Sequence, residues 1–174
     1  MLFNGVFFGV YISSVYKSFA NGLIDDSTLT IAGAIGSFIN GSSRIFWATL
    51  QDHYGFRNVY IAMLLIQLFT SISVYFFRDS KYIYSILICL AFLCEGGHFS
   101  TFPAMAVKIF GIAEGGKIFT IAFFAVPLSS LLGFGLAENR DIFSEISIFI
   151  LAAILTFVNI ILLIFFDESE IKVT

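Results

Sequence analysis

Three ionisable side chains lie deep inside long apolar stretches of this sequence: Arg44, Glu95 and His98. If these stretches are helices, Arg44 lies about 12 Å before Asp52, and Glu95 lies about 20 Å from either end of its stretch. A charge near the middle of a bilayer costs at least about 2.5–3.5 kcal/mol and is usually turned toward protein or a wet cavity. We therefore predict that Arg44 binds an anionic substrate group, and that Glu95 or His98 carries a coupling proton or gates the site.

A structural explanation of the same residues stays open. Arg44 and Glu95 could form an ion pair between two helices, and His98 could be a hydrogen-bonded packing residue. Gly36, Asn40 and Arg44 follow one another at four-residue spacing, so they share one helix face. We predict that this face binds substrate, with the amide one turn from the guanidinium. A packing stripe that holds one polar network would give the same pattern.

Other kinds of chemistry find no support. His53 and His98 are far apart, and the sequence contains no His-x-x-x-His or paired-cysteine metal motif. Cys89 and Cys94 lie in one apolar run and are expected to be buried as small hydrophobic residues. With no nucleophile–base pair visible, we expect no enzyme, no metal and no cofactor. The basic residues are scattered singly, which argues against a nucleic-acid partner.

The composition indicates an integral membrane protein whose main partner is the lipid bilayer. Hydrophobic residues make up 59% of the 174 residues and charged residues 12%, whereas soluble domains are about 45–50% apolar and about 25% charged. About 20 apolar residues span the hydrocarbon core. Such stretches lie at about 2–20, 28–50, 58–77, 82–107, 117–137 and 145–166. These runs are too long for barrel strands, so we expect one all-α transmembrane domain over residues 1–174.

Glycine and proline divide the expected spans into two groups. They occur in the first, second, fourth and fifth spans, whereas the third and sixth contain neither. Small residues let helices approach closely or bend, so we predict that the first group is inner and mobile and the second outer and lipid-facing. The alternative is that glycine is simply common in membrane helices. Six spans would place both termini on one side, but basic residues divide evenly between the two sides and leave the orientation open.

The segment A-T-L-Q-D-H-Y-G-F-R, residues 48–57, resembles the G-x-L-x-D-R-x-G-R loop of the major facilitator superfamily. Its matching positions are Leu50, Asp52, Gly55 and Arg57, while Ala48 replaces the first glycine and His53 the usual basic residue. Upstream, N-x-x-x-R-I-x-W at 40–47 resembles the eighth helix of the oxalate/formate-antiporter and monocarboxylate-transporter branches. G-G-H-F-S-T-F-P-A at 96–104, followed by Phe110-Gly111, resembles the tenth helix and next loop of the oxalate/formate branch.

This resemblance implies that the chain is the C-terminal six-helix half of such a transporter, helices 7–12, built as a 3+3 inverted repeat. It implies a cytoplasmic loop between the second and third spans, and therefore cytoplasmic termini. It also implies that Arg44 contacts a substrate carboxylate, and that Asp52, with Gly55 and Arg57, forms a latch to the opposite half. Asn40 stands where monocarboxylate transporters carry an aspartate, which argues against proton coupling through that pair. The fifth span lacks the basic residue of oxalate-type members.

We therefore expect a secondary transporter half for a small organic anion, a monocarboxylate, working by alternating access as an antiporter or symporter. Because Met1 falls almost at the start of an apolar span, we expect a fragment or a half-size protein. Its partner would be the missing N-terminal six-helix half or another copy. The alternative is a non-transporting membrane scaffold protein derived from such a half.

Overall fold

The computed structural model describes residues 1–139 and 142–166, and these residues form six helices. The helices are α1 (Leu2–Phe19), α2 (Asp26–Tyr54), α3 (Phe56–Phe76), α4 (Lys81–Ala122), α5 (Ala125–Glu138) and α6 (Glu145–Ile164). The all-α class predicted from the apolar runs is therefore confirmed.

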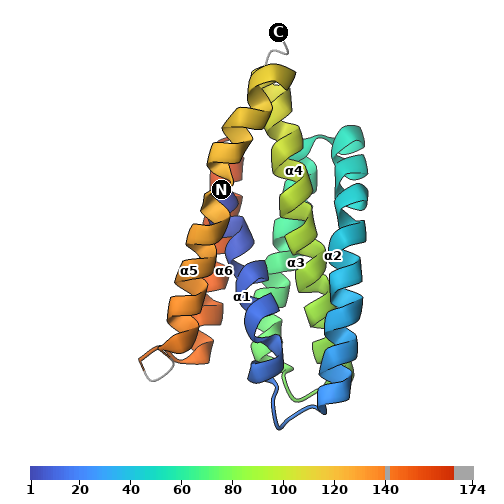
Figure 1. The fold of residues 1–174 in the computed structure, drawn as a ribbon, viewed down its shortest axis with the longest axis vertical. Coiled ribbons are helices and arrows are strands. Elements are labelled where there is room, and N and C mark those ends of the chain that lie inside the picture. The colour runs from blue at the N-terminus through green and yellow to red at the C-terminus, as the bar shows by residue number, and fades with distance from the viewer. Residues whose placement is uncertain (140–141, 167–174) are drawn as a thin grey trace.

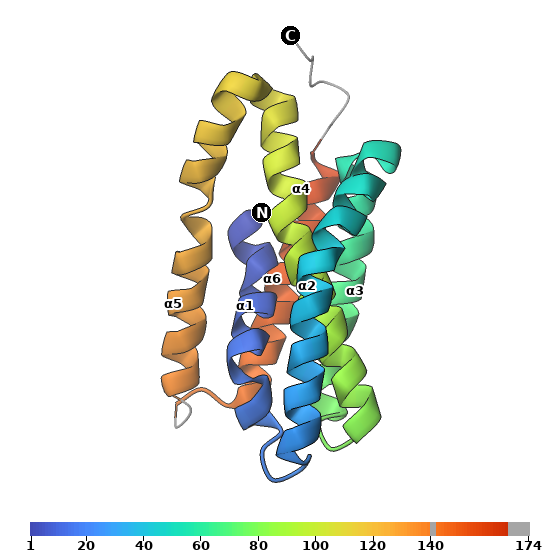
Figure 2. The same ribbon diagram turned by 45° about the vertical axis from the view of Figure 1, so that its right-hand side comes forward.

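The helices form two layers (Figures 1 and 2). One layer runs α5, α1, α4, α2, and each of these helices packs against the next in the row. The second layer consists of α3 and α6, which pack against each other and against α4 and α1. This arrangement separates the glycine-containing helices from the two helices that lack glycine. Which layer faces lipid stays a prediction.

The contact between α2 and α4 is the one that positions the candidate site. The buried residues of α2 are spaced by one, three, four or seven positions, as expected for one helix face against a neighbour: Leu29, Ala32, Gly33, Gly36, Ser43, Trp47 and Gln51. On α4, a side chain at Gly96 would collide with the Asn40 carbonyl, and one at Gly97 would lie 2.8 Å from the Trp47 ring. The Gly-Gly pair therefore allows the close approach of α2 and α4.

The turn between α2 and α3 is a single residue, Gly55. Its φ of 80° and ψ of 160° are readily adopted only by glycine, and its N–H donates to the Gln51 carbonyl at 2.9 Å. We expected the second span to end at residue 50 and a charged loop to follow. Instead the helix continues to Tyr54, so Asp52 lies in the last turn of α2 and Arg57 in the first turn of α3.

The boundary between the fourth and fifth predicted spans also differs from expectation. Residues 108–117, expected to be a loop, are largely helical, and the chain departs from helix at Gly111, where φ is 76° and ψ is 168°. After Gly111 the chain turns back along the bundle (Figure 2). The returning helix is interrupted after Ala122, and α5 then begins two residues before Pro127. A proline in the first turn of a helix is tolerated because its missing N–H has no helical acceptor there.

The opposite end of the bundle is held by Asp25, which caps α2. Its carboxylate accepts hydrogen bonds from the Thr28 backbone N–H at 3.0 Å, from the Ser27 hydroxyl and from Lys81 Nζ at 2.9 Å. The Ser27, Lys81 and Thr28 bonds hold the pKa of Asp25 well below its usual range. The same bond with Asp25 raises the pKa of Lys81, at the start of α4. These contacts fasten the start of α2 to the start of α4.

Three helical stretches in the described part of the chain are long and apolar enough to cross a bilayer. They are Phe56–Phe76, the stretch Lys81–Glu138 that contains α4 and α5, and Glu145–Ile164. They cover the third to sixth expected spans. The crossing of the membrane by α1 and α2, the latter carrying Asn40 and Arg44, stays a prediction.

Candidate functional site

Arg44, Asn40 and Glu95 form a hydrogen-bonded chain between α2 and α4. Arg44 Nη2 donates to Asn40 Oδ1 at 3.4 Å, and Asn40 Nδ2 donates to Glu95 Oε2 at 3.0 Å. The sequence left open a direct ion pair between Arg44 and Glu95. Among the described residues no such ion pair is present. The amide instead stands between the guanidinium and the carboxylate and touches both.

Glu95 lies where three helices meet. Its side chain is only 8% exposed, and its Cβ would be 2.8 Å from a Cβ placed at Gly9 of α1. The carboxylate therefore lies against α1 on one side and reaches Asn40 of α2 on the other. Because a buried carboxylate is costly without hydrogen-bond donors, the Asn40 amide is important to this arrangement.

Arg44 is exposed, and its guanidinium packs over an aromatic ring. The guanidinium carbon lies 5.1 Å from the centroid of Phe99 on α4, and Phe99 in turn contacts Phe123, which follows α4. A cation over an aromatic face is held in place electrostatically while its edge keeps its N–H donors. With one long hydrogen bond to Asn40, this guanidinium can bind a planar anion such as a carboxylate.

The structure does not bring Gly36 to this group. Gly36 is buried against Phe92, whose ring carbon would be 3.0 Å from a Cβ placed there. It allows α4 to approach α2 one turn away from Asn40. Gly36 therefore serves helix packing, which was the alternative interpretation of this face. Asn40 and Arg44 are adjacent, as their spacing predicts.

His98 belongs to a different polar group from Arg44. It is completely buried, and its Nε2 is 2.8 Å from Gln67 Oε1 on α3. Gln67 Nε2 then donates to the Gly5 carbonyl of α1 at 3.0 Å and to Thr156 Oγ1 of α6 at 2.9 Å. The Gln67 amide of α3 therefore forms hydrogen bonds with residues of α1, α4 and α6. His98 Nδ1 has no hydrogen-bond partner among the described residues.

The three residues of the expected latch lie at the α2–α3 end of the bundle. Asp52 is exposed, and Gly55 forms the turn. Arg57 Nη2 donates to the Ile164 carbonyl at 3.3 Å, where α6 ends. Arg57 therefore connects the turn to the C-terminal end of α6, a favourable place for a cation. The role of Asp52 toward an opposite half stays a prediction.

Several polar residues of these groups were not singled out from the sequence. Gln67 and Thr156 complete the His98 group, and Asn159 Nδ2 donates to the Met1 carbonyl at 2.9 Å and to Tyr60 Oη at 3.3 Å. The signal that could have found them is an amide inside an apolar run. Amides must be hydrogen-bonded inside a bilayer just as charges must be compensated.

Comparison with known proteins adds a family and a relative. The sequence matches the family model of the Major Facilitator Superfamily over residues 1–173. Apicoplast pyruvate carrier 1 of Toxoplasma gondii is 26% identical over 122 residues, which are 68% of this chain and 22% of that protein. The chain thus matches about a fifth of the length of that relative.

Proposed function

This chain belongs to the Major Facilitator Superfamily, and we propose that it supplies one six-helix half of a secondary transporter for a small monocarboxylate. In such a transporter the substrate site lies near the midplane between two halves, which alternate in opening to either side. The similarity to a protein named as a pyruvate carrier supports a substrate with a single carboxylate. The oxalate/formate or monocarboxylate branch is part of this proposal.

The observation that carries the proposal is the exposed Arg44 guanidinium beside Asn40 and Phe99. Its described polar contact is a 3.4 Å bond to an amide, so most of its donors are left for a ligand. A substrate carboxylate would accept two parallel bonds from the guanidinium. It would compete with Asn40 Oδ1 for the Arg44 donors, while Asn40 Nδ2 keeps its bond to Glu95.

This competition gives a route from substrate binding to proton coupling. The Asn40 amide contacts Arg44 with its oxygen and Glu95 with its nitrogen. When Glu95 is ionised it only accepts hydrogen bonds, and when protonated it can also donate one. Loss of the Arg44–Asn40 bond makes the Asn40 amide a weaker donor, because hydrogen bonds in a chain polarise one another, and the ionised Glu95 is then stabilised less. In this proposal Glu95 carries the proton, and His98 has a gating role through Gln67.

The test is uptake of labelled pyruvate by the transporter assembled from this chain and its proposed N-terminal half. Arg44→Lys retains the charge but loses the planar fork, so it should raise KM by about tenfold or more. The matched control is Ser42→Ala, because Ser42 is exposed on the same helix and its hydroxyl bonds to the Phe38 carbonyl. Unchanged kinetics in Arg44→Lys and Arg44→Ala would remove the anion site. A folded protein without any uptake of organic anions would favour the scaffold alternative.

A further inference from the structure

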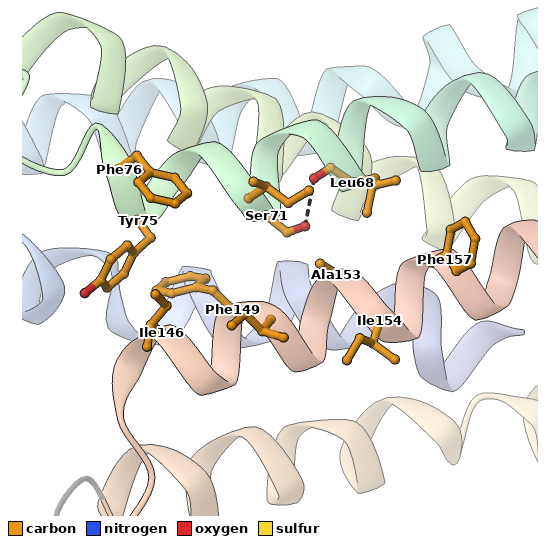
Figure 3. Close-up of a pocket in the computed structure, with 11 residues that line it drawn as sticks. Leu68, Ser71, Tyr75, Phe76, Ile146, Phe149, Ala153, Ile154 and Phe157 are labelled. Carbon is orange, nitrogen blue, oxygen red and sulfur yellow. Dashed lines mark hydrogen bonds between the residues drawn. The ribbon is translucent and has the colours of Figure 1, made fainter.

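An apolar groove of about 440 Å³ runs between α3 and α6, in the layer that does not contain Arg44 (Figure 3). Small residues, Ser71 and Ala153, lie where the two helices face each other, and large exposed side chains such as Phe76, Ile154 and Phe157 flank them. The Ser71 hydroxyl donates to the Leu68 carbonyl of its own helix at 3.0 Å. The groove therefore offers a ligand almost no polar group.

The length of the groove corresponds to one leaflet. Its α6 side extends from Ile146 to Phe157, a rise of about 16 Å. The hydrocarbon core is about 30 Å thick, so one leaflet contributes about 15 Å. Because Ile146 lies in the first turn of α6, the groove begins at the end of the bundle where α6 starts. It ends near the middle of the length of the bundle.

Arg78 lies at the outer end of this groove. It follows α3, and its guanidinium carbon is 5.2 Å from the ring centroid of Tyr75, a groove residue, and 5.6 Å from that of Phe19. Its Nη1 donates to Glu145 Oε2 at 3.4 Å, and its side chain is 39% exposed. The two rings orient the guanidinium, and the long bond to Glu145 leaves further donors for a phosphate oxygen.

We propose that the α3–α6 groove binds one acyl chain of a membrane phospholipid, whose phosphate is held by Arg78. The site is charged at one end and apolar along the rest, which is the pattern of a lipid in one leaflet. A helix from a second copy would cross both leaflets, whereas this groove ends near the middle. The inference does not depend on the transport proposal, since it uses neither Arg44 nor Glu95.

The experiment is native mass spectrometry of the purified chain after delipidation, titrated with dioleoylphosphatidylglycerol or with dioleoylglycerol, which lacks the phosphate. We expect one phospholipid per chain, bound about tenfold more tightly than dioleoylglycerol, as for loss of one charge-assisted hydrogen bond. Arg78→Gln should remove that preference. Ala153→Phe, which fills the groove, should weaken both lipids.

Two controls separate the site from general lipid adhesion. Lys81→Gln removes a cation at the same end of the bundle but outside the groove, and Ala34→Phe adds a ring at an exposed position of α2. Both should bind phospholipid like the wild type. If Arg78→Gln lowers the unfolding temperature, the test uses Arg78→Lys, which keeps the charge and should keep the preference for the phospholipid. Ala153→Phe should still weaken the binding of both lipids. The proposal would be overturned if all variants bound phospholipid equally, if the two lipids bound equally, or if the chain formed a dimer that excludes lipid.

Discussion

The Asn40 amide donates a hydrogen bond to Glu95 at 3.0 Å, across a helix contact that joins residues 55 positions apart in the sequence. On its other side the same amide accepts a bond from Arg44 at 3.4 Å. An amide is suited to this place because it carries both a donor and an acceptor and has no charge of its own. Through these two hydrogen bonds, Asn40 is the residue by which an anion at Arg44 would affect Glu95.

Replacing Asn40 by alanine should therefore destabilise the protein more than neutralising Glu95. Asn40→Ala leaves a buried carboxylate oxygen without its donor, which costs about 1–3 kcal/mol. Glu95→Gln retains an oxygen that accepts the Asn40 bond, so its free energy of unfolding should stay within about 0.5 kcal/mol of the wild type. Unfolding in a mixed detergent series measures both. An Asn40→Ala protein as stable as the wild type would contradict this account of the bond.

The His98–Gln67 pair should behave as one structural unit. Each of His98→Leu and Gln67→Leu leaves a buried polar atom unpaired and should destabilise by about 1–3 kcal/mol. The double variant removes both partners, so its cost should be smaller than the sum, with a coupling of about 0.5–3 kcal/mol. Strict additivity in unfolding measurements would show that the two side chains do not depend on each other.

The sequence predicted the local parts of these groups better than the distant ones. Asn40 and Arg44 are bonded, as residues one helical turn apart can be. Of the three ionisable residues that lie deep inside apolar runs, Glu95 and His98 are buried and Arg44 is exposed. The partners of those two residues depend on the register between helices. Nothing in the spacing of one helix determines that Glu95 meets Asn40.

The helix boundaries show the same limit. Charges near residues 52 and 108 suggested loops, but a charged side chain can also lie on the exposed side of a helix, as Asp52 does in the last turn of α2. The actual breaks occur at Gly55 and Gly111, where the chain adopts a positive φ. Glycine permits this conformation without requiring it, so the sequence alone indicates several possible breaks and does not choose among them.

Acid should weaken the α2–α4 fastening through Asp25. Because its folded pKa lies below the ordinary value of 3.8, its contribution is complete above about pH 4 and is lost as the pH falls toward the folded pKa. Asp25→Asn keeps an N-cap but lacks the charge that attracts Lys81. The variant should therefore lose less stability than the wild type between about pH 4 and pH 2 in thermal unfolding. Parallel curves for the two proteins would contradict this role.

The same pair should respond to alkali in the opposite direction. The folded pKa of Lys81 is raised by its bond to Asp25, so its contribution is complete below the ordinary value of 10.5 and is lost as the pH rises through the folded pKa. Lys81→Gln should flatten the fall in unfolding temperature above about pH 10. Asp79→Asn is the control, because no hydrogen bond or ion pair of Asp79 is present in the described part of the chain. A fall as steep in Lys81→Gln as in the wild type would argue against the contribution of this bond.

Two glycine-to-alanine substitutions should differ in their effect on stability although both add one methyl group to a helix. At Gly5 the new Cβ would lie 2.6 Å from His98 Cε1 and 2.7 Å from Tyr60 Oη, and both rings are completely buried. Neither ring can move without disturbing the Gln67 and Asn159 bonds, so Gly5→Ala should destabilise by about 1–3 kcal/mol. At Gly133 the nearest atom would be 3.6 Å away, an ordinary contact. Gly133→Ala should therefore be neutral or stabilising by up to about 1 kcal/mol, because alanine has the higher helix propensity. Equal unfolding free energies for the two variants would contradict the close packing of α1 against His98.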